Sequence, residues 1–327
     1  MNFGEVMDIL YTIIRESFIF SVPLLIVALG GMFSEKSGVI NIALEGAMVF
    51  GAFFGIGFIR IMENSGSPLD SNLMLILAGI ISMIAGGLFS SLLAFSAINM
   101  KADQTIGGTA LNLLAPAVVI YATRALSPQD VKNIQFSTSF LIQKIPFLGD
   151  IPVIGDIFFR KINIMLYIGI AIWIISWIVI RKTRFGLRLS ACGEHPQAAD
   201  SVGINVYHYR WAGTIISGCL AGLGGLAYII SSTVSFDGSV NGYGFLAIAV
   251  LIFGQWKPEK IVWAALFFGI TKSFASTYYL IPAISNLSIA WFFKMLPFIA
   301  TLIVLMFSSK SSRAPKSEGI PYDQGKR

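Results

Sequence analysis

Apolar residues are gathered along the chain into long runs that short polar stretches separate. A run of about 20 apolar residues can cross the hydrocarbon core of a bilayer as a helix. The pattern predicts nine such segments, at residues 17–33, 38–59, 73–98, 106–125, 162–180, 211–232, 244–256, 261–280 and 287–307. The segment 244–256 is shorter than the ~17 residues that a straight span needs, so whether it crosses fully stays open.

Composition supports the same class of protein. Charged residues make up 12% of the chain, against about 25% in a typical soluble domain. Hydrophobic residues make up 55%, and the mean hydropathy is +0.76. These values exclude an ordinary soluble domain and predict an all-α, polytopic membrane protein.

The two ends of the chain differ from the apolar middle. Residues 1–16 place Val6, Leu10 and Ile14 at helical spacing, which predicts an amphipathic helix lying in the membrane interface. Residues 17–307 form the predicted transmembrane domain, with a charged loop at 181–210. The polar tail at 308–327 contains Pro and Gly, and we expect it to be poorly ordered.

The net charge of +6 is carried mainly by loops and by the tail. Most Lys and Arg residues in loops fall on the side of the tail if all nine segments cross. The positive-inside rule then predicts an N-terminus outside and a C-terminus inside the cell. We expect the basic side to face anionic membrane lipid and a protein partner, and not nucleic acid.

Catalytic and metal-binding chemistry has little support in the residues. The chain has two Cys, at Cys192 and Cys219, and two His, at His195 and His208. A four-ligand metal site or a disulfide framework would need nearly all of them to converge, so we expect no metal and no catalytic residue. The phosphate-binding pattern G-x-x-x-x-G-K-[ST] is missing from the sequence, so we do not expect this chain to bind ATP through a P-loop.

Polar residues inside the predicted spans are candidates for a substrate pathway, because buried polar groups in a bilayer need a partner or a purpose. Asn41 and Glu45 lie four positions apart in the second segment, and Thr109 and Asn112 share a stripe in the fourth. Lys272 falls near the middle of the eighth, where we expect it to pair with Glu45 or another acceptor. A shared polar cavity and plain interhelical hydrogen bonding both explain these residues.

Small residues repeat at every fourth position in the second, third and sixth segments. Such ladders allow helix backbones to approach closely. We expect plain helix packing here. Helix surfaces that slide past one another during a working cycle are the less favoured interpretation. The ladders are Ala43, Ala47, Gly51 and Gly55; Ala78, Ser82, Gly86, Ser90 and Ala94; and Gly218, Gly222 and Gly225.

The loop 181–210 contains start and stop signals for a short helix. Pro196 can open a helix and Gly203 can close it. Between them, Ala198, Ala199 and Val202 would form a small apolar face flanked by charge. This arrangement predicts a short helix that inserts into a groove on a cytosolic partner.

This loop resembles the coupling loop of ABC-transporter permeases of the branched-chain amino acid, ribose and simple-sugar superfamily, through its pattern T-x-F-G-L…G-E-x-P-x-A-A-x-x-x-G-I. The stretches at 30–46, 110–114, 217–225 and 242–249 agree with the same superfamily. The motif S-E-K-S-G-V-I-N at 34–41, the I-P-V-I-G unit at 151–155 and the tail at 314–327 look most like the smaller permease subunit of bacterial nucleoside importers.

The resemblance implies a four-part importer in the bacterial cytoplasmic membrane. Its parts would be this chain, a second homologous permease, a cytosolic ATPase that binds ATP and Mg, and an extracellular lipid-anchored binding protein for the nucleoside. Coupling to the ATPase is carried over onto the loop positions that match the motif, together with one neighbouring basic residue. These are Gly186, Arg188, Gly193, Glu194, Pro196, Ala198, Ala199, Gly203 and Ile204.

Other functions remain as alternatives at this point. A simple-sugar or branched-chain amino acid importer would share the same motifs, because the binding protein sets most of the selectivity. An ion-coupled secondary transporter would use Glu45 and Lys272 as a coupling pair and would need no ATPase. An intramembrane enzyme is weaker, because neither His lies in a predicted span.

Overall fold

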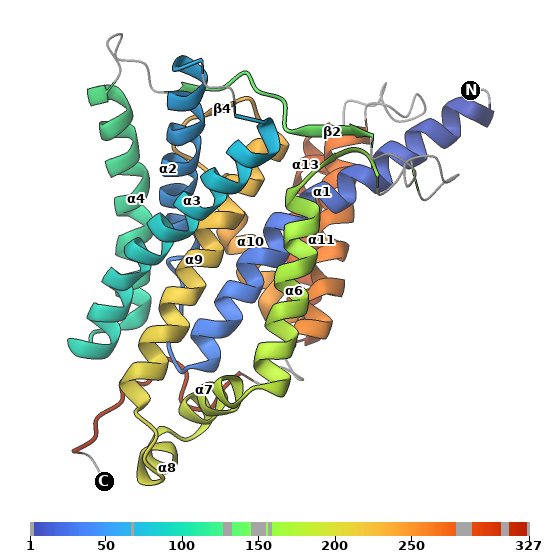
Figure 1. Ribbon diagram of the computed structural model, residues 1–327. Coiled ribbons are helices and arrows are strands. Elements are labelled where there is room, and N and C mark those ends of the chain that lie inside the picture. The colour runs from blue at the N-terminus through green and yellow to red at the C-terminus, as the bar shows by residue number, and fades with distance from the viewer. Residues whose placement is uncertain are drawn as a thin grey trace.

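In the computed structural model, helices stand side by side in a bundle (Figure 1). The structure describes residues 3–66, 69–126, 133–144, 155, 159–278, 290–308 and 314–325. The longer helices are α1 (Phe3–Lys36), α2 (Leu44–Asn64), α3 (Ser71–Ala94) with its π-helical extension η1 (Phe95–Asn99), α4 (Gln104–Leu126), α6 (Met165–Lys182), α9 (Val206–Ser232), α11 (Pro258–Thr277) and α13 (Ala290–Ser308). The shorter ones are α7 (Arg184–Glu194), α8 (Pro196–Ser201) and α10 (Tyr243–Phe253). The expected all-α fold class is confirmed by these helices.

Short strands occur at one end of the bundle, which we call the strand end. They are β1 (Ile134–Gln135), β2 (Leu141–Lys144), β3 (Arg160–Asn163) and β4 (Ser235–Phe236). β1 pairs with β4, and β2 with β3, both antiparallel. Helices α7 and α8 lie at the opposite end, which we call the α7–α8 end (Figure 1). The turn-rich stretch at 145–156 falls almost wholly outside the described residues.

Within the described part of the chain, six helices are long and apolar enough to cross a membrane. They are α1 from Ile9 onward, α2, α3 with η1, α4, α6 and α9. The remaining expected segments fall on α10, α11 and α13. Helix α10 has 11 residues, and at 1.5 Å per residue it covers about half of a ~30 Å hydrocarbon core.

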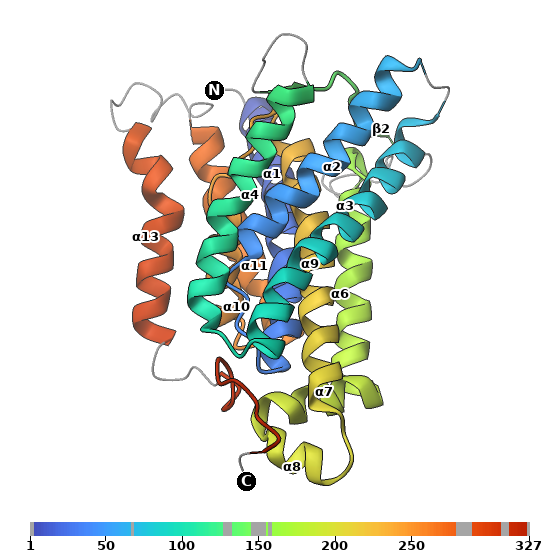
Figure 2. The same ribbon diagram turned by 90° about the vertical axis from the view of Figure 1, so that its left-hand side faces the viewer.

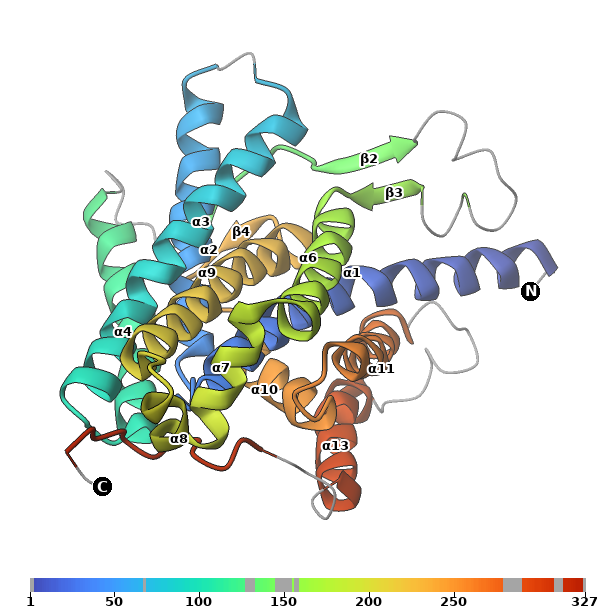
Figure 3. The same ribbon diagram turned by 60° about the horizontal axis from the view of Figure 1, so that its bottom comes forward.

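Helix α1 runs without interruption through the boundary that the sequence predicted between residues 16 and 17. The hydroxyls of Ser17 and Ser21 donate to the carbonyls of Ile13 and Ser17, each at 2.6 Å. The polar side chains at this point are therefore satisfied by the helix itself and do not break it. The first turns extend away from the bundle (Figure 3), and their place in the membrane interface stays a prediction.

Helices α1 and α9 form the centre of the bundle, with α2, α3 and α11 packed around them (Figure 2). In the most apolar window of α1, 94% of the residues are buried, against 17% for α4. α4 therefore lies at the periphery, and its exposed apolar side chains suit a lipid or protein neighbour.

The small-residue ladders meet where α2, α3 and α9 touch. A Cβ atom added to Gly51 would lie 2.3 Å from the Cα of Gly222, and one on Gly222 would lie 2.2 Å from the carbonyl oxygen of Ser82. No side chain fits at these distances, so the three backbones are in direct contact. The packing role expected for these ladders is confirmed.

Candidate functional site: a helix junction and a connected loop face

A polar junction lies where helix α2 begins, inside the bundle. The sequence predicted a helix from residue 38, but residues 37–43 are non-helical and α2 starts at Leu44. Asn41 therefore precedes the helix, and it does not share a helix face with Glu45 as expected. The Asn41 side chain is fully buried, and its Nδ2 donates to Ser217 Oγ on α9 at 2.8 Å.

Glu45 connects the start of α2 with the start of α10. Its Oε1 accepts from the backbone N–H of Gly242 at 2.8 Å, and its Oε2 accepts from that of Gly244 at 2.6 Å. α10 runs from here toward the α7–α8 end, where Trp256 donates to Glu35 near the end of α1. α2 runs the other way, and Glu63 near its end accepts from Thr138 beside the strands. Two helix N-termini therefore meet at one carboxylate, which their partial positive charges stabilise.

Asn112 on α4 holds the same junction from the other side. Its Nδ2 donates to the carbonyl of Ile42 and its Oδ1 accepts from the N–H of Gly46, both at 2.8 Å. Thr109 lies apart, on the exposed face of α4, where its hydroxyl donates to the Thr105 carbonyl at 2.7 Å. The structure thus brings Asn41, Glu45 and Asn112 together and leaves Thr109 outside the group.

Lys272 reaches the junction from α11. Its Nζ lies 5.6 Å from the centre of the ring of Tyr243, which is the first residue of α10. This is a cation–π arrangement, and the carboxylate of Glu45 is bound by backbone amides, so the pairing of Lys272 with Glu45 that the sequence predicted is wrong. The Tyr243 ring packs on Tyr228 with centroids 4.1 Å apart. Sequence reasoning missed both tyrosines, although the glycines at 242 and 244 flank one of them.

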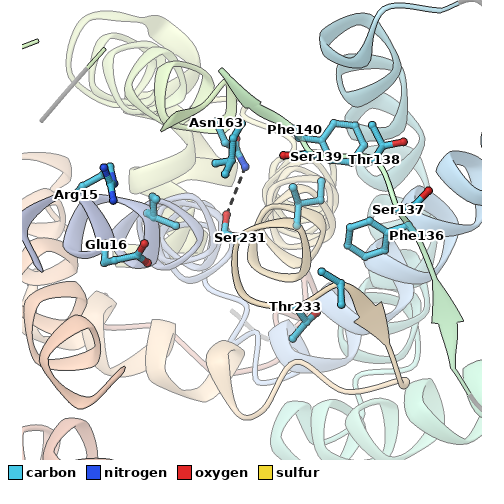
Figure 4. A pocket seen from close by; sticks show the side chains of 14 residues that line it. Arg15, Glu16, Phe136, Ser137, Thr138, Ser139, Phe140, Asn163, Ser231 and Thr233 are labelled. Carbon is cyan, nitrogen blue, oxygen red and sulfur yellow. Dashed lines mark hydrogen bonds between the residues drawn. The ribbon is translucent and has the colours of Figure 1, made fainter. Parts of the chain in front are cut away.

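A pocket of about 310 Å³ opens at the strand end (Figure 4). Arg15 and Glu16 of α1 lie on one side of it, and Phe136 and Phe140 lie across from them, with hydroxyl groups between. Asn163 Nδ2 donates to Ser231 Oγ at 3.5 Å within this pocket. This pocket was not predicted from the sequence, although a run of hydroxyl residues at 137–139 lies between two phenylalanines there.

At the other end, the loop 181–210 forms two helices. α8 begins at Pro196 and ends at Ser201, shortly before Gly203, whose φ of +82° favours glycine. The short helix predicted between Pro196 and Gly203 is therefore confirmed. α7 was not predicted. Its N-cap Thr183 accepts from the N–H of Gly186 at 3.2 Å, a signal that the sequence does contain.

The α7 residues for which the sequence predicts a coupling role are placed by close packing and by surface contacts. A Cβ on Gly193 would lie 2.4 Å from the carbonyl oxygen of Lys36, so α7 rests directly on the end of α1. Gly186 packs equally closely against the end of α6. Arg188 is exposed and donates to the Tyr209 hydroxyl at 3.3 Å, and Glu194 is exposed.

α8 divides its apolar residues between two directions. Ala199 is buried inside this chain, next to Cys192 and Val206, and Pro196 is also buried. Ala198 is exposed, and Val202 is 73% exposed, as is Leu187 of α7. Ile204 is half-buried, and its N–H donates to the Ala199 carbonyl at 3.1 Å, which closes the end of α8. The loop therefore keeps an outward apolar surface at Leu187, Ala198 and Val202.

Comparison with known proteins places this architecture among transport permeases. Residues 13–305 match the family model for the branched-chain amino acid transport system permease component. The chain is 40% identical to the guanosine ABC transporter permease protein NupQ of Bacillus subtilis, over 99% of this chain and 100% of that one. It is 38% identical to the nucleoside ABC transporter permease protein NupC of Lactococcus lactis, over 98% and 100%. NupB, a second nucleoside ABC transporter permease protein of Lactococcus lactis, is 25% identical over 77% of this chain and 69% of its own length.

These relationships cover the bundle, the junction and the α7–α8 loop together. The chain is a multi-pass protein of the cytoplasmic membrane and a transport permease, not an enzyme. It belongs to the family of branched-chain amino acid transport system permease components.

Proposed function

We propose that this chain is a permease subunit of an ATP-driven ABC importer and forms half of the translocation pathway for nucleosides. The observation that carries the proposal is the similarity to the guanosine permease NupQ over nearly the whole of both chains. NupC supports the same substrate class at a comparable identity. A sugar or a branched-chain amino acid as substrate is the nearest alternative within the family.

The proposed topology has nine crossings, with the N-terminus outside and the C-terminus in the cytoplasm. The broken stretch of residues 238–253 makes one of these crossings, partly as non-helical chain and partly as α10. Irregular backbone is tolerated at such depth when protein surrounds it, and here Glu45 binds the amides that start α10. The concentration of Lys and Arg near α7, α8 and the tail supports a cytoplasmic location for that end.

The proposed complex has three further kinds of subunit. A second homologous permease completes the pathway, as the occurrence of both NupB and NupC in Lactococcus lactis suggests. A cytosolic ATPase binds ATP and Mg, and an extracellular lipid-anchored protein delivers the nucleoside. This chain itself is proposed to hold no cofactor and no metal.

The α7–α8 loop is the proposed contact with the ATPase. Its outward residues Leu187, Ala198 and Val202 would fill an apolar groove, with Glu194 beside it. The packing of Gly193 on Lys36 would pass movement of the loop directly to α1. The residues assigned to coupling are Gly186, Arg188, Gly193, Glu194, Pro196, Ala198, Ala199, Gly203 and Ile204.

The substrate pathway is proposed to pass the helix junction. Asn41, Glu45, Asn112 and Lys272 supply polar groups around the meeting point of α2 and α10, with Thr109 on the outer face of α4. Two interrupted helices meeting inside a bundle are a common setting for transport sites in membrane proteins. Amide groups can also hydrogen-bond ribose hydroxyls without a fixed charge.

Uptake of radiolabelled nucleosides by cells that express the complete complex tests this proposal. Wild-type cells should show saturable uptake that stops when ATP is depleted. Glu194→Arg should abolish uptake while the complex still reaches the membrane, because a cation replaces an anion at the ATPase contact. Asp237→Arg, an equally exposed charge reversal at the strand end, is the matched control and should retain uptake.

Each contrary result points to a different conclusion. Absence of nucleoside uptake in the wild type would reject the substrate class and direct the assay to sugars. Uptake that survives ATP depletion with an intact ion gradient would support a secondary transporter. Normal uptake with Glu194→Arg would remove the coupling role from this loop.

A further inference from the structure

The C-terminal segment, residues 314–325, lies along the α7–α8 end in a defined conformation (Figure 3). The sequence predicted a poorly ordered tail, and for these residues that expectation is wrong. Backbone hydrogen bonds hold the segment: the N–H of Ser317 donates to the Gly193 carbonyl at 2.9 Å, and that of Gly319 to the Gly38 carbonyl at 3.2 Å. One short segment thus binds both the end of α7 and the turn that follows α1.

The same segment also contacts α8 and the turn between η1 and α4. Gln324 Nε2 donates to the Asp200 carboxylate on α8 at 3.3 Å. Asp323 forms an ion pair with Lys101 at 3.0 Å, and Lys101 lies in this turn, three residues before α4 begins, with a left-handed φ of 53°. One segment therefore contacts both α8 and the turn between η1 and α4.

Tyr322 and Arg210 anchor the segment. Tyr322 is 5% exposed and packs in a cluster with Cys192, Ala199 and Val206. Arg210 of α9 is 1% exposed, and its Nη1 donates to the Ile320 carbonyl at 2.9 Å. Its guanidinium also lies 5.9 Å from the centre of the Tyr322 ring. A buried arginine needs partners to offset its desolvation, and part of that partnership comes from the tail.

We propose that the C-terminal segment is a working part of the coupling apparatus, which ties α7 and α8 to the α1–α2 turn and to the start of α4. Tyr322 and Arg210 are its positioning residues. When the ATPase moves α8, the C-terminal segment transmits that movement to Lys101 in the turn before α4 and to the stretch 37–43 that leads into the Glu45 junction. This inference rests on the proposed function, because it takes the α7–α8 loop as the contact with the ATPase.

Docking of the segment is tested through a native thiol. Cys192 is fully buried in the same cluster as Tyr322, and burial raises the pKa of its thiol to about 11 from an ordinary value of 9.0. In the assembled complex, Tyr322→Ala should expose this thiol and raise its rate of maleimide labelling at pH 8 by up to ~100-fold, because thiolate is the reactive form. Mass spectrometry of the Cys192 peptide measures the rate without interference from other cysteines.

Two control variants isolate the anchor. Ile320→Ala removes a side chain that is 58% exposed and keeps the backbone carbonyl that Arg210 binds, so labelling should stay slow. Tyr322→Phe keeps the buried ring and should also protect Cys192. Labelling of Tyr322→Ala at the wild-type rate would overturn the proposal.

The coupling role is tested by measuring nucleoside uptake and ATP hydrolysis in the same proteoliposomes. Tyr322→Ala should lower uptake per ATP several-fold while ATP hydrolysis and assembly persist, and Tyr322→Phe should restore the ratio. An unchanged ratio in Tyr322→Ala would overturn the role in coupling. A wild-type complex without nucleoside uptake would instead reject the proposed substrate. The labelling test of segment docking does not depend on the substrate and would remain valid.

Discussion

Glu45 offers a direct test of how the junction is built. Its carboxylate binds the amides of Gly242 and Gly244, which begin α10. Glu45→Ala leaves both amides without this acceptor, whereas Glu45→Gln keeps one side-chain oxygen that can accept from one of them. The start of α10 should therefore open more often in both variants, and more so with alanine.

The size of the effect follows from the hydrogen bonds. A buried donor left without a partner costs about 1–3 kcal/mol, and loss of a negative charge at a helix N-terminus adds about 0.3–1 kcal/mol. Because both amides are partly buried, we expect about 2 kcal/mol for Glu45→Gln, which is roughly a 30-fold increase in local opening. For Glu45→Ala, we expect local opening to be about tenfold more frequent than for Glu45→Gln.

Hydrogen–deuterium exchange of the peptide that contains residues 238–247 measures this opening. Faster exchange at Gly242 and Gly244 is the expected result, with other regions unchanged. Asp237→Asn is the matched control, because this exposed carboxylate accepts from Ser239 in the same loop and does not bind the α10 amides. Wild-type exchange at both glycines in Glu45→Ala would refute the reasoning.

The remaining predictions concern packing and pH. Gly222→Leu should prevent the complex from accumulating, because its Cβ would lie 2.2 Å from the Ser82 carbonyl oxygen, whereas Gly57→Leu, with nothing within 4 Å of its Cβ, should accumulate normally; membrane immunoblots compare them. Burial raises the pKa of Glu318 to about 7 from 4.5, against the opposing effect of its hydrogen bond with Glu35, so the C-terminal segment should bind most strongly below pH 4.5 and progressively less up to about pH 7. Glu318→Gln stays neutral, so at pH 7.5 the wild type should label at Cys192 faster than Glu318→Gln, and this difference should shrink as the pH is lowered to 5; equal rates at both pH values would contradict this.

Local sequence patterns predicted much of the fold. Run length located the helices, because a bilayer-spanning helix needs a set number of apolar residues whatever surrounds it. Small residues at every fourth position identified the surfaces where Gly51 and Gly222 meet. Pro196 and Gly203 marked α8, because both act on the backbone of their own turn.

The motif of the α7–α8 loop led to the family, which the match over residues 13–305 establishes. The same local reasoning missed α7, where a Thr183 cap starts a helix of 11 residues inside a charged loop. The polar composition of the tail, with its Pro and Gly residues, also predicted poor order. Composition does not show that Tyr322 occupies a buried position beside Cys192 and Arg210.

By itself, then, the sequence determined the membrane class, the helices and the family, because these depend on composition and on neighbours a few positions apart. Only the tertiary structure decided what the polar residues bind. Glu45 meets Gly242 and Gly244 nearly 200 positions along the chain, and Lys272 meets the Tyr243 ring instead of a carboxylate. Such partners are selected by packing of whole helices, and no local pattern encodes which backbone amide will reach a given carboxylate.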